Sequence, residues 1–295
     1  MEVLCTRPHC PRPRNQCPDL DDPDKLATIE QKYCTTCGMP LILGGRYLPV
    51  KLLGKGGFGA AFLSLDRYRP KTKCVLKQFQ PSIQLSPQAL ETAKNLFIRE
   101  GEVLEELGKH PRIPDLYAFF PLLVKNQLTG NEDRFFYLAQ EYIDGKNLEE
   151  ILAEQRAPFS EADVRGILEE MLEVLRFVHE NRSIHRDIKP SNIMRDKNGR
   201  LYLLDFGAVK QATSSGGNLS GKSTTIYSAG YAPPEQQLGK QVSPATDLYA
   251  LAVTCITLLT NQYPDNLYDP DEKRWFWQQY APHVSVRFPA ILGIL

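Results

Sequence analysis

The sequence has no excess of charge of either sign, no membrane-length apolar run and no apolar leader. Lys and Arg together number 35, and Asp and Glu also number 35, so the formal net charge is +0. This balance gives no indication of binding to nucleic acid or to an anionic membrane surface. The most apolar stretch, residues 248–259, is too short to span a bilayer and is typical of a buried helix. Because the first residues lack the apolar segment of a secretory signal, we expect a cytoplasmic protein without a membrane segment.

The 7 cysteines are unevenly distributed, and five of them precede residue 38. An odd count without a secretion signal argues against a disulfide framework. Cys5 with Cys10, and Cys34 with Cys37, form two pairs, and four thiolates suit a tetrahedral structural zinc ion. We expect these four to bind zinc; the alternative is a tail with free thiols. Cys17 is an extra thiol that could replace a ligand or act in redox exchange.

The composition and the apolar pattern of the chain change near residue 46. Residues 1–45 are rich in Cys, Pro and Asp with little apolar periodicity, and they predict a small Cys-rich, zinc-ribbon-like module. Residues 46–143 alternate like strands, apart from one helix predicted within 86–110. Helical spacing dominates residues 144–295, so the fold class is α+β.

A glycine-rich stretch, LGKGGFGAAF, lies between two predicted strands. Gly54, Gly56 and Gly59 place it at the tip of a hairpin, where backbone N–H groups can fold over phosphates without side chains in the way. The pattern alone is weak, because ordinary turns also produce it. A lysine on the following strand strengthens it.

Lys77, in CVLKQF, is that lysine, and it would suit a contact to the α- and β-phosphates of a nucleotide. Such a lysine needs an acidic partner to hold it in place. Glu100 is the candidate and Glu102 the alternative, because both lie in the helix predicted next along the chain. The alternative is that Lys77 is an ordinary lysine that faces solvent.

The stretch SIHRDIKPSNIM is the most specific in the chain. Asp187 could accept a proton from a hydroxyl nucleophile, and Lys189 could neutralise a transferring phosphoryl group. Asn192 offers an amide oxygen to Mg²⁺. Asp205 follows an apolar strand in LYLLDFG, where its carboxylate could bridge metal ions. Together, in this order, these residues indicate phosphoryl transfer.

The motifs GKGGFG, VLK, HRDIKPSN, DFG and PPE resemble those of the eukaryotic-type protein kinase family, from about Tyr47 to the end. The resemblance implies a two-lobed kinase domain over 46–295, with an antiparallel sheet lobe to about residue 143 and a helical lobe from about 144. It implies ATP and Mg²⁺ as cofactors and protein Ser/Thr hydroxyls as substrates, because Lys189 stands where tyrosine kinases usually differ. No nucleic-acid partner is implied.

The resemblance also assigns roles. Asp187 is the catalytic base, Asp247 braces its loop, and Lys77 pairs with Glu100. Glu141 to Ile143 form the adenine-binding hinge, with Gln140 gating the pocket behind it. The residues placed around ATP and Mg²⁺ are Leu53, Gly54, Lys55, Gly56, Gly57, Phe58, Gly59, Ala61, Lys77, Glu141, Ile143, Asn192 and Asp205.

Three positions depart from the family pattern without removing a catalytic group. They are Ala61, usually valine, Pro233, usually alanine, and Ala252, commonly glycine. The Cys-rich prefix is similar to the four-cysteine segment that precedes the kinase domain in some cyanobacterial Ser/Thr kinases.

Residues 216–223 read G-x-x-x-x-G-K-S, which is the pattern of a P-loop. A P-loop follows a strand directly and leads into a helix. This segment lies inside the activation segment between Asp205 and Glu235, and a glycine and two prolines follow it, which disfavours a helix. Context therefore argues against a P-loop nucleotidase. We expect autophosphorylation in this segment, with Thr224 and Thr225 as candidates.

The family's Pro-Glu glutamate forms a buried ion pair with an arginine near the end of the helical lobe. Glu235 matches it, and no arginine follows Arg287. We therefore expect the chain to be a fragment lacking C-terminal helices, with Glu235 unpaired or recruiting Arg287. The alternative function is a pseudokinase or scaffold that binds nucleotide with little turnover.

Overall fold

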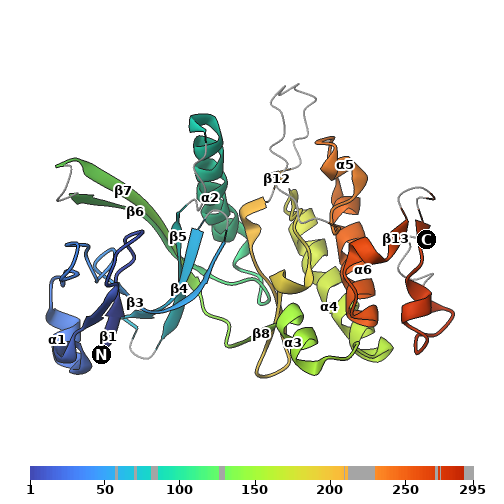
Figure 1. Cartoon of the computed structure of the whole chain (residues 1–295), viewed down its shortest axis with the longest axis horizontal. Helices are drawn as coiled ribbons and strands as arrows, with labels where there is room; N and C mark the ends of the chain where they lie inside the picture. The colour runs from blue at the N-terminus through green and yellow to red at the C-terminus, as the bar shows by residue number, and fades with distance from the viewer. Residues whose placement is uncertain are drawn as a thin grey trace. The chain divides into compact units, whose positions relative to one another are not determined.

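The chain forms two compact units in the computed structural model (Figure 1). The structure describes residues 1–56, 59–69, 72–80, 86–125, 130–208, 210–211, 230–269, 272 and 274–288. The first unit comprises Met1–Gly101 and Asp115–Tyr142, and the second comprises Glu102–Pro114 and Ile143–Leu295. Among the described residues, no helix combines the length and apolarity that crossing a bilayer requires.

A five-stranded antiparallel sheet is the centre of the first unit, in the order β3-β4-β5-β7-β6. Its strands are β3 (Tyr47–Lys55), β4 (Gly59–Asp66), β5 (Lys73–Phe79), β6 (Leu116–Lys125) and β7 (Glu132–Glu141). Strands β6 and β7 form an antiparallel hairpin that pairs from Leu116↔Gln140 to Lys125↔Glu132. Burial alternates along β5, as period-two side chains require when the two faces have different neighbours.

Each face of the sheet has its own cover. The face of Lys77 and Phe79 meets α2 (Pro87–Leu107), where Phe97 packs between Phe79 and Phe119, with tilted rings, at ring-centroid distances of 5.7 and 6.0 Å. The predicted helix within 86–110 is therefore confirmed. The opposite face carries Leu76 and Tyr137, which belong to one apolar core with the N-terminal residues.

The N-terminal residues 1–45, hereafter the N-terminal module, contain little regular structure. Its elements are β1 (Glu2–Leu4), β2 (Arg14–Gln16), η1 (Pro18–Asp21) and α1 (Pro23–Thr28). Met39 and Ile42 are fully buried in the core that the module shares with the sheet. Arg46 binds the carboxylate of Asp66 through Nε at 2.9 Å and Nη2 at 2.6 Å. The module is therefore packed into the sheet unit.

The second unit is dominated by helices. Its strands are β8 (Gly145–Asn147), β9 (Ser183–Ile184), β10 (Ile193–Asp196), β11 (Leu201–Leu203), β12 (Lys210–Gln211), β13 (Tyr268–Asp269) and β14 (Arg274–Trp275). Its helices are α3 (Leu148–Gln155), α4 (Glu161–Glu180), α5 (Pro234–Gln237), α6 (Pro244–Thr260), η2 (Pro190–Asn192), η3 (Phe206–Ala208), η4 (Pro264–Asn266) and η5 (Trp277–Tyr280).

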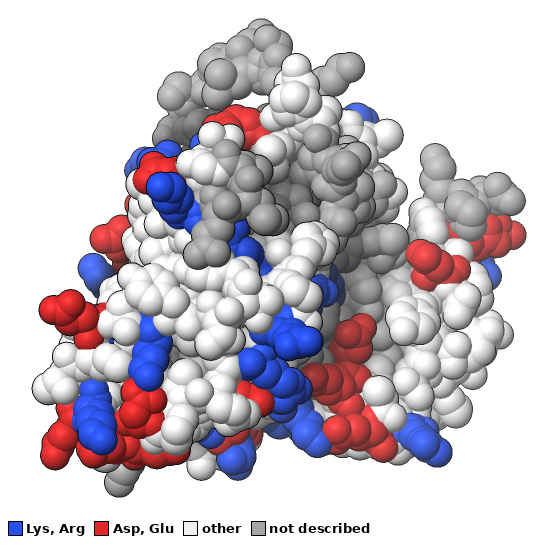
Figure 2. All heavy atoms as spheres, turned by 60° about the vertical axis from the view of Figure 1, so that its left-hand side comes forward, with Lys and Arg blue, Asp and Glu red and all other residues white. Residues whose placement is uncertain are grey.

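The buried helix predicted for residues 248–259 is confirmed, because this stretch lies in α6 and is buried over nearly its whole length. Ser160 caps α4 by accepting a hydrogen bond from the Asp163 N–H. Basic and acidic side chains interleave on the face that Figure 2 shows, as the balanced composition leads one to expect.

Candidate active site and metal centre

Lys77 and Glu100 form an ion pair within the first unit. Lys77 Nζ lies 2.5 Å from Glu100 Oε1, and the two side chains are 17% and 9% exposed. Strand alternation turns Lys77 toward α2, on which Glu100 is buried, whereas Glu102 is exposed. The structure thus pairs Lys77 with Glu100 and leaves its ammonium at the sheet face that α2 covers.

The glycine-rich stretch joins β3 to β4. Gly54 pairs with Ala61 across the two strands, and the Gly56 N–H donates to the Gly59 carbonyl at 2.8 Å. A Cβ on Gly59 would lie 2.6 Å from the Gln78 carbonyl oxygen, so only glycine fits there. A Cβ on Gly54 or Gly56 would meet open space, which leaves room for a ligand at the backbone. Leu53 and Lys55 are exposed beside it, while Gly57 and Phe58 lie outside the described residues.

The two hinge residues that the sequence singled out lie at the ends of the two units. Glu141 ends β7, where its N–H donates to the Asp115 carbonyl at 2.9 Å, and burial raises the pKa of its carboxyl. Ile143 begins the longer of the two segments that form the second unit, and it is buried there.

The loop of residues 185–192, hereafter the Asp187 loop, gathers three of the predicted residues. Lys189 Nζ lies 3.0 Å from Asp187 Oδ2. Asn192 Nδ2 donates both to Asp187 Oδ2 at 2.9 Å and to the Asp187 carbonyl at 2.8 Å. The amide oxygen of Asn192 therefore faces away from these two bonds and remains the group suited to a hard cation.

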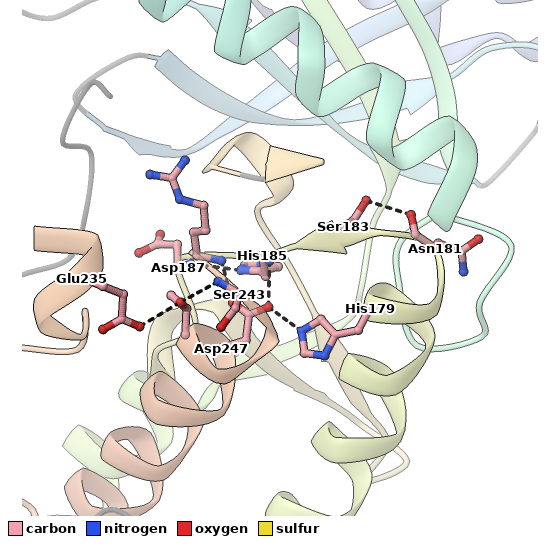
Figure 3. Close-up of polar contacts among 10 residues, drawn as sticks. His179, Asn181, Ser183, His185, Asp187, Glu235, Ser243 and Asp247 are labelled. Atoms are coloured by element: carbon pink, nitrogen blue, oxygen red, sulfur yellow. Dashed lines mark hydrogen bonds and ion pairs between the residues drawn. The ribbon is translucent and has the colours of Figure 1, made fainter. Parts of the chain in front are cut away.

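Asp247 holds this loop from below (Figure 3). Its fully buried carboxylate accepts hydrogen bonds from the His185 N–H at 2.9 Å and the Arg186 N–H at 2.8 Å. His179 Nε2 lies 2.8 Å from the same carboxylate. A buried carboxylate is favourable only with such partners, so Asp247 and the loop backbone stabilise each other.

His185 packs inside the loop as a neutral ring. Its Nε2 donates to the Leu204 carbonyl at 3.0 Å, and its Nδ1 accepts from the Asp187 N–H at 3.3 Å. Burial lowers the pKa of His185, which favours the neutral form. The ring of Phe206 meets it edge-on at 4.8 Å between ring centroids. This contact joins the loop to the segment that carries Asp205.

Asp205 adopts a left-handed backbone conformation with φ 62°. The preceding residue, Leu204, donates its N–H to the Asn192 carbonyl at 2.8 Å. This hydrogen bond places the two predicted magnesium ligands, Asn192 and Asp205, at the ends of neighbouring strands. A non-glycine residue in this conformation is uncommon and is found preferentially at functional sites. A carboxylate and an amide oxygen are a donor set that fits Mg²⁺.

Glu235 has a hydroxyl partner in place of the expected arginine. Thr246 Oγ1 donates to Glu235 Oε1 at 3.1 Å. Within 230–269 and 274–288, no Lys or Arg pairs with Glu235, and Arg274 instead lies 3.9 Å from Glu272. Thr224, Thr225 and residues 216–223 lie outside the described residues.

Four cysteine sulfurs converge in the N-terminal module. The Sγ atoms of Cys5, Cys10, Cys34 and Cys37 all lie within 4.8 Å of one another. Cys5 Sγ is 3.5 Å from Cys37 Sγ, and Cys10 Sγ is 3.8 Å from Cys34 Sγ. Tetrahedral zinc with Zn–S bonds near 2.3 Å places its sulfurs about 3.8 Å apart, so the cluster fits that ion. Cys17 is buried outside the cluster, and all of these thiols are free of disulfides.

A buried hydrogen-bond chain that the sequence did not reveal ties this cluster to the sheet. Thr6 Oγ1 lies 2.7 Å from the Tyr137 hydroxyl, which also accepts from Gln78 Nε2 at 2.8 Å. Thr6 adjoins Cys5, and Gln78 adjoins Lys77. Burial raises the pKa of Tyr137, so the phenol stays neutral and able to donate. The sequence feature that could have indicated this hydrogen-bond chain is the presence of polar residues in otherwise apolar strands.

Comparison with known proteins agrees with this geometry. Residues 47–283 match the protein kinase domain, and the chain belongs to the protein kinase family. Serine/threonine-protein kinase F of Synechocystis sp. is 58% identical over 97% of this chain and 58% of its own length. Serine/threonine-protein kinase B of the same organism is 38% identical over 90% and 43%, and PknA of Nostoc sp. is 39% identical over 86% and 44%. The chain thus spans about half the length of these relatives.

Proposed function

We propose that this chain is the catalytic part of a protein serine/threonine kinase, which transfers the γ-phosphoryl group of ATP to Ser and Thr hydroxyls of proteins. The arrangement around Asp187 carries the proposal. A carboxylate held by Asn192 Nδ2 at 2.9 Å and accompanied by Lys189 at 3.0 Å is suited to orient a hydroxyl nucleophile. The similarity to three bacterial kinases whose names specify serine/threonine supports the substrate class.

Each residue then has a distinct task. Asp187 accepts the proton of the substrate hydroxyl as attack proceeds, and Lys189 offsets negative charge on the transferring group. Lys77, oriented by Glu100, holds the α- and β-phosphates, while the backbone between Gly54 and Gly59 covers them. The tasks require positioning and charge, because phosphoryl transfer involves little covalent chemistry of the protein.

Two metals complete the proposal. Asn192 and Asp205 would hold Mg²⁺, which neutralises charge on the phosphates when bound. Cys5, Cys10, Cys34 and Cys37 would hold one structural Zn²⁺, which closes a module with few regular hydrogen bonds. We also retain autophosphorylation at Thr224 or Thr225 as part of the proposal, with Arg186, in the Asp187 loop, as a cation that could pair with the phosphate.

Transfer of labelled phosphate from ATP to a protein acceptor tests this function. The wild-type chain should label Ser and Thr, and Asp187→Ala should reduce the rate by about 100-fold or more, because general base catalysis is typically worth about 10²–10⁴-fold. Nucleotide affinity should change little in Asp187→Ala. Binding of ATP without transfer in the wild type would support the pseudokinase alternative.

A further inference from the structure

Arg186, the residue before Asp187, has a left-handed backbone conformation with φ 70°. Residues that carry a Cβ atom rarely adopt this conformation, and their surroundings must hold them in it. The Arg186 N–H donates to Asp247 Oδ1 at 2.8 Å. This bond fixes one end of the residue, so the direction of its carbonyl, which begins the peptide bond to Asp187, depends on a second contact.

The second contact comes from Gln236 on α5. Gln236 Nε2 donates to the Arg186 carbonyl at 2.7 Å. On the other side of the same peptide bond, the Asp187 N–H donates to His185 Nδ1 at 3.3 Å. The peptide between Arg186 and Asp187 is therefore held at both of its polar groups, and the shorter of the two bonds comes from outside the Asp187 loop.

Gln236 is the buried residue of α5, and it is 3% exposed. A buried amide is unfavourable unless it is hydrogen-bonded, whereas an apolar side chain of similar size would fill the position without that requirement. The bond to Arg186 thus accounts for an amide at this position. Gln237 provides a contrast, because it is exposed and its Nε2 donates at 2.7 Å to the Ala232 carbonyl in its own segment.

We propose that Gln236 is a positioning residue, which holds the peptide before Asp187 so that the Asp187 carboxylate meets the substrate hydroxyl. The proposal rests on the proposed function, in which Asp187 accepts the proton of that hydroxyl. Loss of the Gln236 donor lets Arg186 relax toward an ordinary backbone conformation, which turns the following peptide and displaces Asp187. A displacement of about 1 Å can reduce the rate of a reaction by about 100-fold.

The affinity for ATP should depend little on Gln236. Lys77 and the glycine-rich stretch, which the proposed function assigns to the nucleotide phosphates, belong to the first unit, whereas Gln236 and the Asp187 loop belong to the second. We therefore expect Gln236→Met to lower kcat by about tenfold or more and to leave the KM for ATP within about twofold of the wild-type value. A residue that serves stability alone would lower the melting temperature without this separation of kcat from KM.

Transfer of labelled phosphate from ATP to a saturating protein acceptor, measured well below the melting transition of each variant, tests the proposal. Methionine fills the volume of glutamine without a donor. Gln237→Met is the matched control, because it makes the same substitution on the same helix without touching the Asp187 loop, and it should keep kcat within about twofold. Equal kcat values for Gln236→Met and Gln237→Met would overturn the proposal. Gln236→Asn keeps an amide but shortens its reach, so it should show the same loss, and it serves as the test if the methionine variant does not fold.

A double variant shows whether Gln236 acts through Asp187. Once Asp187 is removed, its position no longer matters, so adding Gln236→Met to Asp187→Ala should lower the residual rate by less than about twofold. A further tenfold loss would show an effect independent of Asp187 and would overturn the positioning role. Absence of transfer by the wild type would instead remove the proposed function, so the two failures are distinguishable.

Discussion

The N-terminal module and the Asp187 loop are both irregular stretches of backbone, yet different chemistry holds each in place. The module converges on four thiols and shares an apolar core with the sheet. The Asp187 loop is fixed by one fully buried carboxylate, Asp247, whose partners include two backbone N–H groups. Irregular backbone lacks the repeated hydrogen bonds of helices and strands, so each region needs an anchor of its own.

Loss of the cysteine cluster and loss of Asp247 should have different consequences. The cysteine cluster anchors a segment that covers one sheet face, including Leu76 and Tyr137, so its loss exposes apolar surface. Asp247 anchors groups that surround Asp187, so we expect its loss to displace the residues of the proposed active site while most of the helical core persists. The comparison therefore predicts a mainly structural effect in the first region and a combined effect in the second.

Removing the thiol anchor should have the largest effect. Cys34→Ser with Cys37→Ser should abolish binding of about one zinc per chain and unfold the module, because structural zinc contributes about 10–16 kcal/mol in small zinc domains. Metal analysis and thermal melting measure both results. Cys17→Ala, outside the cluster, should keep the zinc. Retention of zinc by the double variant would show that the four thiols are not the ligand set.

Replacing Asp247 by Asn should have the second-largest effect on stability. The substitution keeps the volume but removes a buried charge that accepts from two backbone N–H groups. Hydrogen bonds to charged groups contribute about 1.5–3 kcal/mol each, so we expect the free energy of unfolding to fall by about 3 kcal/mol or more. Urea denaturation measures the loss, and phosphoryl transfer should fall with it. A variant of unchanged stability would show that the loop has another anchor.

Tyr137→Phe should have a smaller effect, confined to the first unit. The hydroxyl joins Thr6 to Gln78, and its removal leaves both polar side chains without that buried partner. We expect a loss of about 1–3 kcal/mol in the free energy of unfolding, with zinc retained. Thr6→Val should cost less than Tyr137→Phe, because Gln78 keeps its partner. The reverse order in chemical denaturation would contradict the proposed chain.

The smallest effect should be a pH dependence of the second unit. Because burial lowers the pKa of His185, the unfolded state binds a proton that the folded state does not. Stability conferred by the neutral ring is present above the unfolded pKa of about 6.5 and declines as pH falls below it, by up to about 1.4 kcal/mol per pH unit. His185→Gln cannot titrate and should flatten that part of the profile. An unchanged slope in urea denaturation between pH 5 and 7 would exclude His185 as its source.

Local sequence patterns predicted those parts of the candidate sites whose residues lie close together in the chain. The Asp187 loop and the cysteine pairs were recognisable because each gathers its groups within a few residues or at metal-ligand spacing. The Thr6–Tyr137–Gln78 chain was not predictable, because it joins three segments across a sheet face whose cover the sequence does not specify. The same holds for Glu235, since its Thr246 partner depends on how α5 meets α6.

The most direct test of the account compares two lysines. Lys77 is paired with Glu100 on the sheet, whereas Lys222 belongs to the P-loop-like stretch in the activation segment. Transfer of labelled phosphate from ATP should be abolished by Lys77→Met and should persist in Lys222→Ala, because the proposed function assigns the α- and β-phosphates to Lys77 and gives Lys222 no role. The opposite result, transfer lost with Lys222 and retained without Lys77, would contradict the assignment of this chain's nucleotide site.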